Sequence, residues 1–270
     1  MESDILISKE KIKNQIKSFS KIENIKSKYI LEKVFNNLEK KKTLNIVKYN
    51  KNIKKGINLN INDYKEYSEK YSSIEIEIKL IINKKICKFI NIAIEDENYY
   101  HIYFNNNEKE IKRYYIDTNE DIKTIKIIID YQVKSLKELF SYCEYIKSIN
   151  FKKFCRSNIN NMSSMFYGCS SLKEINLNNF NTINVNNMIK MFYGCSSLKE
   201  LNLNNFNTNN VTNMDSMFSR CSSLKELNLN NFINTNNVTY MRSMFSRCSN
   251  ELIIKIKTEY KNIKEEAFYN

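Results

Sequence analysis

The sequence predicts an α+β fold. We expect a C-terminal solenoid of parallel strands, about five coils long, capped by a small antiparallel β-meander and preceded by a short helical segment. Three observations support this expectation. The C-terminal half repeats itself every 26 or 27 residues, the segment before it alternates apolar and polar residues, and apolar residues nearer the N-terminus recur at helical spacing. A repeat this short cannot bury its own apolar face, so successive copies must stack.

The repeats are near-copies at residues 162–187, 188–213 and 214–240. They contain the strings MFYGCSSLKEINLNNFNT, MFYGCSSLKELNLNNFNT and MFSRCSSLKELNLNNFINT. Residues at equivalent positions of successive copies form columns. Tracing these columns outward reveals a degenerate first copy and a partial last one, which gives solenoid bounds of 136–257. The cysteine column is Cys143, Cys169, Cys195, Cys221 and Cys248, and the phenylalanine column is Phe140, Phe166, Phe192, Phe218 and Phe245.

Each copy is expected to contain one short strand. Leu172, Ile175 and Leu177 form an L-x-x-I-x-L pattern in which Ile175 and Leu177 point inward. The same columns end at Ile254 and Ile256, which predicts a last strand there. Opposite the strands, the spacing of the methionines and phenylalanine within residues 186–192 predicts one short helical turn.

The string MFYGCSSLKELNLNNFNTNNVTNM resembles the repeat of the BspA-type leucine-rich-repeat family, over roughly residues 136–256. The resemblance implies a right-handed solenoid that binds proteins or extracellular matrix without enzymatic activity. Family members at cell surfaces carry export signals and anchors. The N-terminal residues show no signal-peptide pattern, and no apolar run is long enough to span a membrane. We therefore expect a cytoplasmic protein, with a surface or secreted location as the alternative.

Residues 27–71 are expected to be helical and follow a lysine-rich lead-in at residues 1–26. Apolar residues from Ile30 to Leu38 recur at helical spacing, and Thr43 is suited to cap a second helix. The segment faintly resembles an F-box, although the usual Leu-Pro opening and closing Trp are missing. That resemblance implies an adaptor for a ubiquitin ligase, and a plain helical packing unit is the alternative.

Residues 74–132 are expected to form the β-meander that caps the first coil, because a terminal coil must shield its open core. Its five strand candidates are IEIEIKLII, ICKFINIAI, YYHIYF, IKRYYI and IKTIKIIID. Residues 258–270 are short and amphipathic, and we expect them to cap the other end.

Composition and motifs argue against catalysis and against nucleic acid as the partner. The chain has one histidine, His101, and lacks a glycine-rich phosphate loop, paired acids and chelating spacings, so we expect no catalytic residues, cofactor or metal. We also expect no pocket in so short a stack. The formal net charge is +13, but lysine and glutamate are interspersed rather than clustered. The cysteine column is expected to be buried and structural. The expected partner is another protein, and the chain is taken to be a monomer.

Two surfaces are candidate partner-binding sites. The open face of the strands would carry three columns, Glu174, Glu200, Glu226; Asn176, Asn202, Asn228; and Asn178, Asn204, Asn230. Asparagines stacked in this way could instead be structural, hydrogen bonding along the solenoid. The second surface is a variable edge beside the Met-Phe turns, with Arg220, Arg242 and Arg247. We therefore expect a non-enzymatic protein-interaction module, with an F-box-like adaptor or a BspA-type surface adhesin as alternatives.

Overall fold

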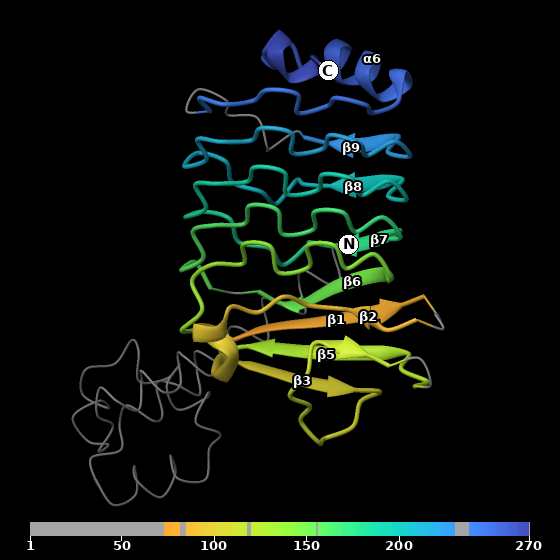
Figure 1. The fold of residues 1–270 in the computed structure, drawn as a ribbon. Helices are drawn as coiled ribbons and strands as arrows, with labels where there is room; N and C mark the ends of the chain where they lie inside the picture. The colour runs from red at the N-terminus through yellow and green to blue at the C-terminus, as the bar shows by residue number, and fades with distance from the viewer. Residues whose placement is uncertain (1–72, 82–84, 118–119, 155, 230–237, 270) are drawn as a thin grey trace, which may run out of the picture. The chain divides into compact units, whose positions relative to one another are not determined.

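The computed structural model describes residues 73–269 except 82–84, 118–119, 155 and 230–237. The lead-in and the F-box-like segment lie outside the described residues, so these two predictions stay open. What is described is a stack of repeats with a β-sheet at one end and a helix at the other (Figure 1). Together these elements fit the predicted α+β class.

A five-stranded sheet covers the first repeat. Its order is β3-β5-β1-β6-β7, and every pair except β6–β7 is antiparallel. Alternate isoleucines of β1 and β5 are completely buried, as their period-two pattern predicts. The elements are β1 Ile74–Leu80, β3 Tyr100–Phe104, β5 Thr124–Ile129, β6 Ile146–Lys153 and β7 Glu174–Asn176, with the 3-10 helix η1 Ile94–Tyr99 before β3.

The predicted meander order is wrong. β1 lies in the middle of the sheet, between β5 and β6, so the first strand of the described residues joins the cap to the repeats. The second candidate forms only β2, Cys87–Lys88, which pairs with β4, Tyr115–Ile116, in a separate sheet. Phe89 and Ile90 are both fully buried, and two successive inward residues cannot continue a strand with alternating faces.

Three short strands, one per repeat, follow β6 along the stack. β6 and β7 pair in parallel, as do β8, Glu200–Asn202, and β9, Glu226–Asn228. β7 and β8 are not paired as strands, so the strand ladder is interrupted there. A column of isolated parallel bridges, which joins Ser135, Asn161, Asn187, Asn213 and Tyr240, continues through all the repeats on another side.

The predicted helical turn opposite the strands is wrong. Lys190 and Gly194 have positive φ angles of 54° and 73°, in the left-handed region, which ends any α-helix at once. The N–H groups of Lys190, Phe192 and Gly194 instead donate to carbonyls of the next repeat at 2.9 Å. The turns of successive repeats are therefore joined by a ladder of backbone hydrogen bonds, in which every second residue donates its N–H group.

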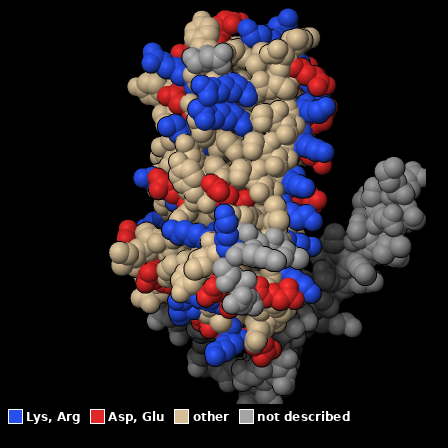
Figure 2. All heavy atoms as spheres, turned by 45° about the vertical axis from the view of Figure 1, so that its right-hand side comes forward, with Lys and Arg blue, Asp and Glu red and all other residues tan. Residues whose placement is uncertain are grey.

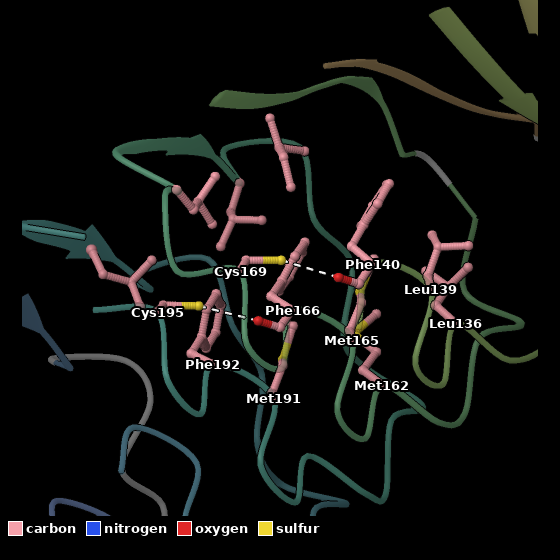
Figure 3. Close-up of a cluster of buried hydrophobic side chains, with 14 of the residues drawn as sticks. Leu136, Leu139, Phe140, Met162, Met165, Phe166, Cys169, Met191, Phe192 and Cys195 are labelled. Carbon is pink, nitrogen blue, oxygen red and sulfur yellow. Dashed lines mark hydrogen bonds between the residues drawn. The ribbon is translucent and has the colours of Figure 1, made fainter. Parts of the chain in front are cut away.

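The core of the stack consists of aligned side chains from successive repeats (Figure 3). The Phe166 and Phe192 rings stack at 5.1 Å with an interplanar angle of 19°, and the other members of the column repeat this arrangement. The cysteine column is buried beside them. Each thiol from Cys169 onward donates to a phenylalanine carbonyl of the preceding repeat at 3.1–3.2 Å.

The last repeat ends in a helix, and the predicted strand at Ile254 and Ile256 is wrong. The helix α6, Asn250–Glu259, begins after Ser249, whose hydroxyl accepts the Leu252 N–H. Leu252 and Ile256 are buried four residues apart, which suits a helix, whereas Ile254 is exposed. The 3-10 helix η3, Glu265–Phe268, follows it.

Candidate functional site: a groove over the strand face

A groove of about 730 Å³ runs over the open face of the strands. It begins at β1, crosses β6 to β9 and ends against α6. The expectation that so short a stack carries no pocket is therefore wrong. Because the strands are short and lie side by side, their outward side chains line the floor of the groove in columns.

The glutamate column lies along this floor. Glu174, Glu200 and Glu226 are exposed. In the strand register Glu174 lies beside Ser148, and Glu200 lies beside Glu226. Glu226 forms an ion pair with Lys255 of α6, and this hydrogen bond raises the pKa of the Lys255 ammonium group. Among the described residues, the carboxylates of Glu174 and Glu200 have no ion-pair partner.

The first asparagine column also lines the groove, but part of its bonding capacity is used within the repeat. The Oδ1 atoms of Asn176 and Asn202 each accept a backbone N–H two residues later, at 3.0 Å. These bonds stabilise the turn that follows each strand. These two oxygens therefore have a structural role within their own repeat, which differs from the predicted hydrogen bonding along the solenoid. Asn228 also lines the groove.

The second asparagine column does not line the groove. Asn178 and Asn204 follow their strands, in the turns, and the Asn178 carbonyl accepts a hydrogen bond from Asn205 Nδ2 at 2.6 Å. Asn230 lies outside the described residues. The groove is therefore lined by two of the three columns that the sequence predicts for the open face of the strands.

The ends of the groove come from outside the repeats, and the sequence prediction missed them. Glu77 and Lys79 of β1 form one end, and Glu77 pairs with Lys152 at 3.3 Å. The other end contains Lys255, Glu259 and Tyr260. The Tyr260 hydroxyl accepts the Leu229 N–H at 3.1 Å, which ties the end of α6 to the last strand. The residues of β1 reach the groove because of the strand order, and the others reach it because the last repeat ends in α6. Neither feature was predicted from the sequence.

The variable edge lies on the turn side, where its arginines are exposed. Arg220 and Arg247 occupy the left-handed positions held by glycine in earlier repeats, and the Arg220 N–H donates to the repeat that contains Arg247. Arg220 lies over the Tyr193 ring at 5.5 Å. The Arg242 N–H donates to the Asp215 carboxylate at 2.7 Å. The three arginines therefore share one side of neighbouring repeats but line no part of the groove.

Figure 2 shows acidic and basic side chains interspersed over one face of the stack, with uncharged residues between them in its middle part.

The lone histidine belongs to the cap and not to the groove. His101 lies between Glu110 and Asp130, with each ring nitrogen 3.2 Å from a carboxylate oxygen. This arrangement joins β3 to the end of β5, which is a structural role.

Neither metal binding nor thiol chemistry has support in the described part of the chain. No group of three or more His, Cys, Asp or Glu side chains there is placed to hold a metal ion. Burial raises the pKa of the Cys143 and Cys248 thiols to about 12, and it raises that of the three thiols between them as well. Nucleophilic cysteines require the opposite shift. No helix within the described ranges is long and apolar enough to cross a membrane.

Comparison with protein families confirms the resemblance seen in the repeats. Residues 62–188 match the model of the BspA type leucine rich repeat region, and residues 134–255 match a family described as a Mycoplasma protein of unknown function. The BspA-type match begins N-terminal to the repeat copies identified in the sequence, and it includes the strands β1 to β5. No curated protein and no solved structure matches the chain.

Proposed function

We propose that this chain, whose residues 62–188 carry BspA-type leucine-rich repeats, is a non-enzymatic module that binds another protein in the groove over its strand face. We further propose that its repeats act as one solenoid of about five coils. The observation that carries the proposal is the groove itself. Its floor repeats the same exposed polar side chains from strand to strand, while the turn side uses its backbone groups to hold the stack together.

The lining of the groove favours binding over catalysis. Glutamates and asparagines repeat along it, whereas acid–base catalysis needs a few unlike groups that converge on one reacting atom. The groove also extends across several elements, since β1, β6, β7, β8, β9 and the end of α6 all line it. Such a surface suits a peptide segment or the edge of a folded partner better than a small substrate.

The location that fits the thiol column best is a reducing compartment such as the cytoplasm. Four of the column thiols serve as hydrogen-bond donors, which requires them to stay protonated and unoxidised. A surface adhesin would work outside the cell. Labelling intact cells with a reagent that does not enter them distinguishes the two, because a cytoplasmic protein stays unlabelled until the cells are lysed.

Photo-crosslinking from inside the groove tests the binding site directly. A photoreactive amino acid placed at Glu200 in the full chain should capture a partner in the native cell, since that side chain is exposed on the groove floor. The same residue placed at Glu251 is the matched control, because Glu251 is exposed on α6 but does not line the groove.

The expected result is a crosslinked protein band that is much stronger from position 200 than from position 251. Equal capture from both positions, or capture from position 251 alone, would overturn the groove as the binding site. Because crosslinking requires no particular charge on the partner, the test is independent of what kind of protein binds.

A further inference from the structure

We infer that the groove recognises a short basic segment of another protein, with two or three lysines or arginines close together in the chain. This inference rests on the proposed function and adds the chemistry of the partner. Two features of the described residues support it: an acidic centre whose carboxylates are unpaired, and a lysine at each end of the groove.

The acidic centre is formed by Glu174 and Glu200. Both are exposed on neighbouring strands, and neither carboxylate has an ion-pair partner among the described residues. β7 and β8 are not paired as strands, but their repeats are closely stacked, with the Tyr167 and Tyr193 rings 4.7 Å apart, so like charges repel each other along the column. A cation placed over the column relieves this repulsion and gains two attractive contacts, whereas a neutral or acidic partner does not.

The ends of the groove limit the length of the basic run. Lys255 forms an ion pair with Glu226 at the α6 end, where Glu259 also lines the groove. Lys79 lies at the β1 end, where Glu77 is already paired with Lys152. A cation moved toward either end therefore meets a lysine and an occupied carboxylate. The free acidic stretch is about 5–10 Å long at the strand spacing, which matches two or three residues of extended chain.

The charge of the rest of this unit makes the selectivity stronger. Residues 73–270 contain 26 Lys and Arg and 21 Asp and Glu, a formal net charge of +5, so a basic partner is attracted most where acidic groups gather. Five glutamates and two lysines line the groove, which is therefore opposite in sign to the chain as a whole. A basic segment that binds there is fixed in one place rather than spread over the surface.

Fluorescence anisotropy with two defined peptides tests the inference. The probe is a fluorescein-labelled octapeptide with three consecutive lysines between glycine and serine residues, and the reversed peptide carries three glutamates instead. The full chain should bind the lysine peptide and not the glutamate peptide, and raising the salt from 50 to 500 mM should weaken that binding.

The key variant is Glu174→Gln with Glu200→Gln, which removes the two central carboxylate charges while preserving side-chain size. We expect it to bind the lysine peptide about tenfold more weakly. The matched control is Glu108→Gln with Glu138→Gln. This control makes the same charge change at exposed positions outside the groove, so its affinity should stay within about twofold of the unmodified chain.

Two outcomes would overturn the inference. They are equal binding of the two peptides, and equal weakening of lysine-peptide binding by the groove and control variants. If crosslinking from position 200 captures a partner without a basic run, the inference fails while the proposed function stands.

Discussion

The thiol of Cys195 donates a hydrogen bond of 3.2 Å to the carbonyl oxygen of Phe166, which lies in the preceding repeat (Figure 3). That carbonyl also accepts the Cys169 N–H at 3.2 Å. The cysteine column therefore joins neighbouring repeats through the core, in addition to filling space there. Alanine at this position would lack that donor.

Replacing Cys195 with alanine should destabilise the protein by about 1–3 kcal/mol, because it removes both the buried sulfur and the donor to Phe166. Urea unfolding measures the change. The matched control is Cys143→Ala in the first repeat, where the thiol makes a long hydrogen bond of 3.9 Å to the Ser141 carbonyl and, among the described residues, none to a phenylalanine carbonyl of another repeat. If the two variants lose equal stability, the inter-repeat hydrogen bond contributes nothing.

The free energy of unfolding should fall as the pH rises above about 9, because the thiols of the cysteine column are buried in the folded protein. In the unfolded chain they lose their protons near the ordinary pKa of 9.0, whereas burial raises the pKa of folded Cys143 and Cys248 to about 12. The unfolded state thus binds fewer protons between pH 9 and 12, so stability is fully present below pH 9 and decreases across that range.

Thermal melts at pH 7, 9 and 10.5 measure this decrease. Burial lowers the pKa of Arg156 to about 10, which acts in the opposite direction but involves a single group. Replacing Cys169, Cys195 and Cys221 together with alanine should flatten the pH dependence. A triple variant that loses stability as steeply as the unmodified chain would contradict the thiol origin.

The sequence predicted the inward columns because the repeats could be compared with one another. Phe166, Phe192 and Leu203 recur at fixed spacing, and each is completely buried. Strand order could not be predicted in this way. β1 lies between β5 and β6 because it can hydrogen bond on both edges, and that choice depends on tertiary contacts rather than on local alternation.

The groove was predictable only in part, for a similar reason. Glu174, Glu200 and Glu226 follow from strand alternation, which places residues that flank inward positions on the outer face. Lys79 and Lys255 belong to β1 and α6, and the positions of these two elements do not follow from the repeat pattern. The end of the repeats was mispredicted because Ile254 continues the strand column, while the Ser249 cap and the four-residue spacing of the buried side chains favour a helix.

Replacing Gly168 with alanine should destabilise the protein more than replacing Gly194. Both residues have positive φ angles, 68° and 73°, and the backbone strain should cost each alanine about 1 kcal/mol. At Gly168, however, an added Cβ would lie 3.1 Å from Tyr142 Cδ1, while at Gly194 the nearest atom is 3.6 Å away. Denaturant midpoints of the two variants measure the difference.

The Tyr142→Ala substitution provides the control for this contact. In that background, the two glycine variants should lose equal stability, since only the shared backbone strain remains. If Gly168→Ala still costs more without the Tyr142 ring, then the ring contact is not the cause.

Replacing Phe268 with alanine should weaken the C-terminal cap and cost about 1–3 kcal/mol. Its ring stacks on Phe245 at 5.4 Å and so extends the phenylalanine column one step beyond the last repeat. The segment also continues the backbone ladder, because the Phe245 N–H donates to the Ala267 carbonyl at 2.8 Å. Tyr269→Ala is the matched control, since that ring is 61% exposed and its loss should hardly change stability.

Hydrogen exchange locates the effect of the Phe268 substitution. Amides of residues 243–248 should exchange faster in this variant, while those of β1 should not, because a repeat contacts only its neighbours. Uniform loss of protection across the stack would instead mean that the cap and the repeats unfold as one unit.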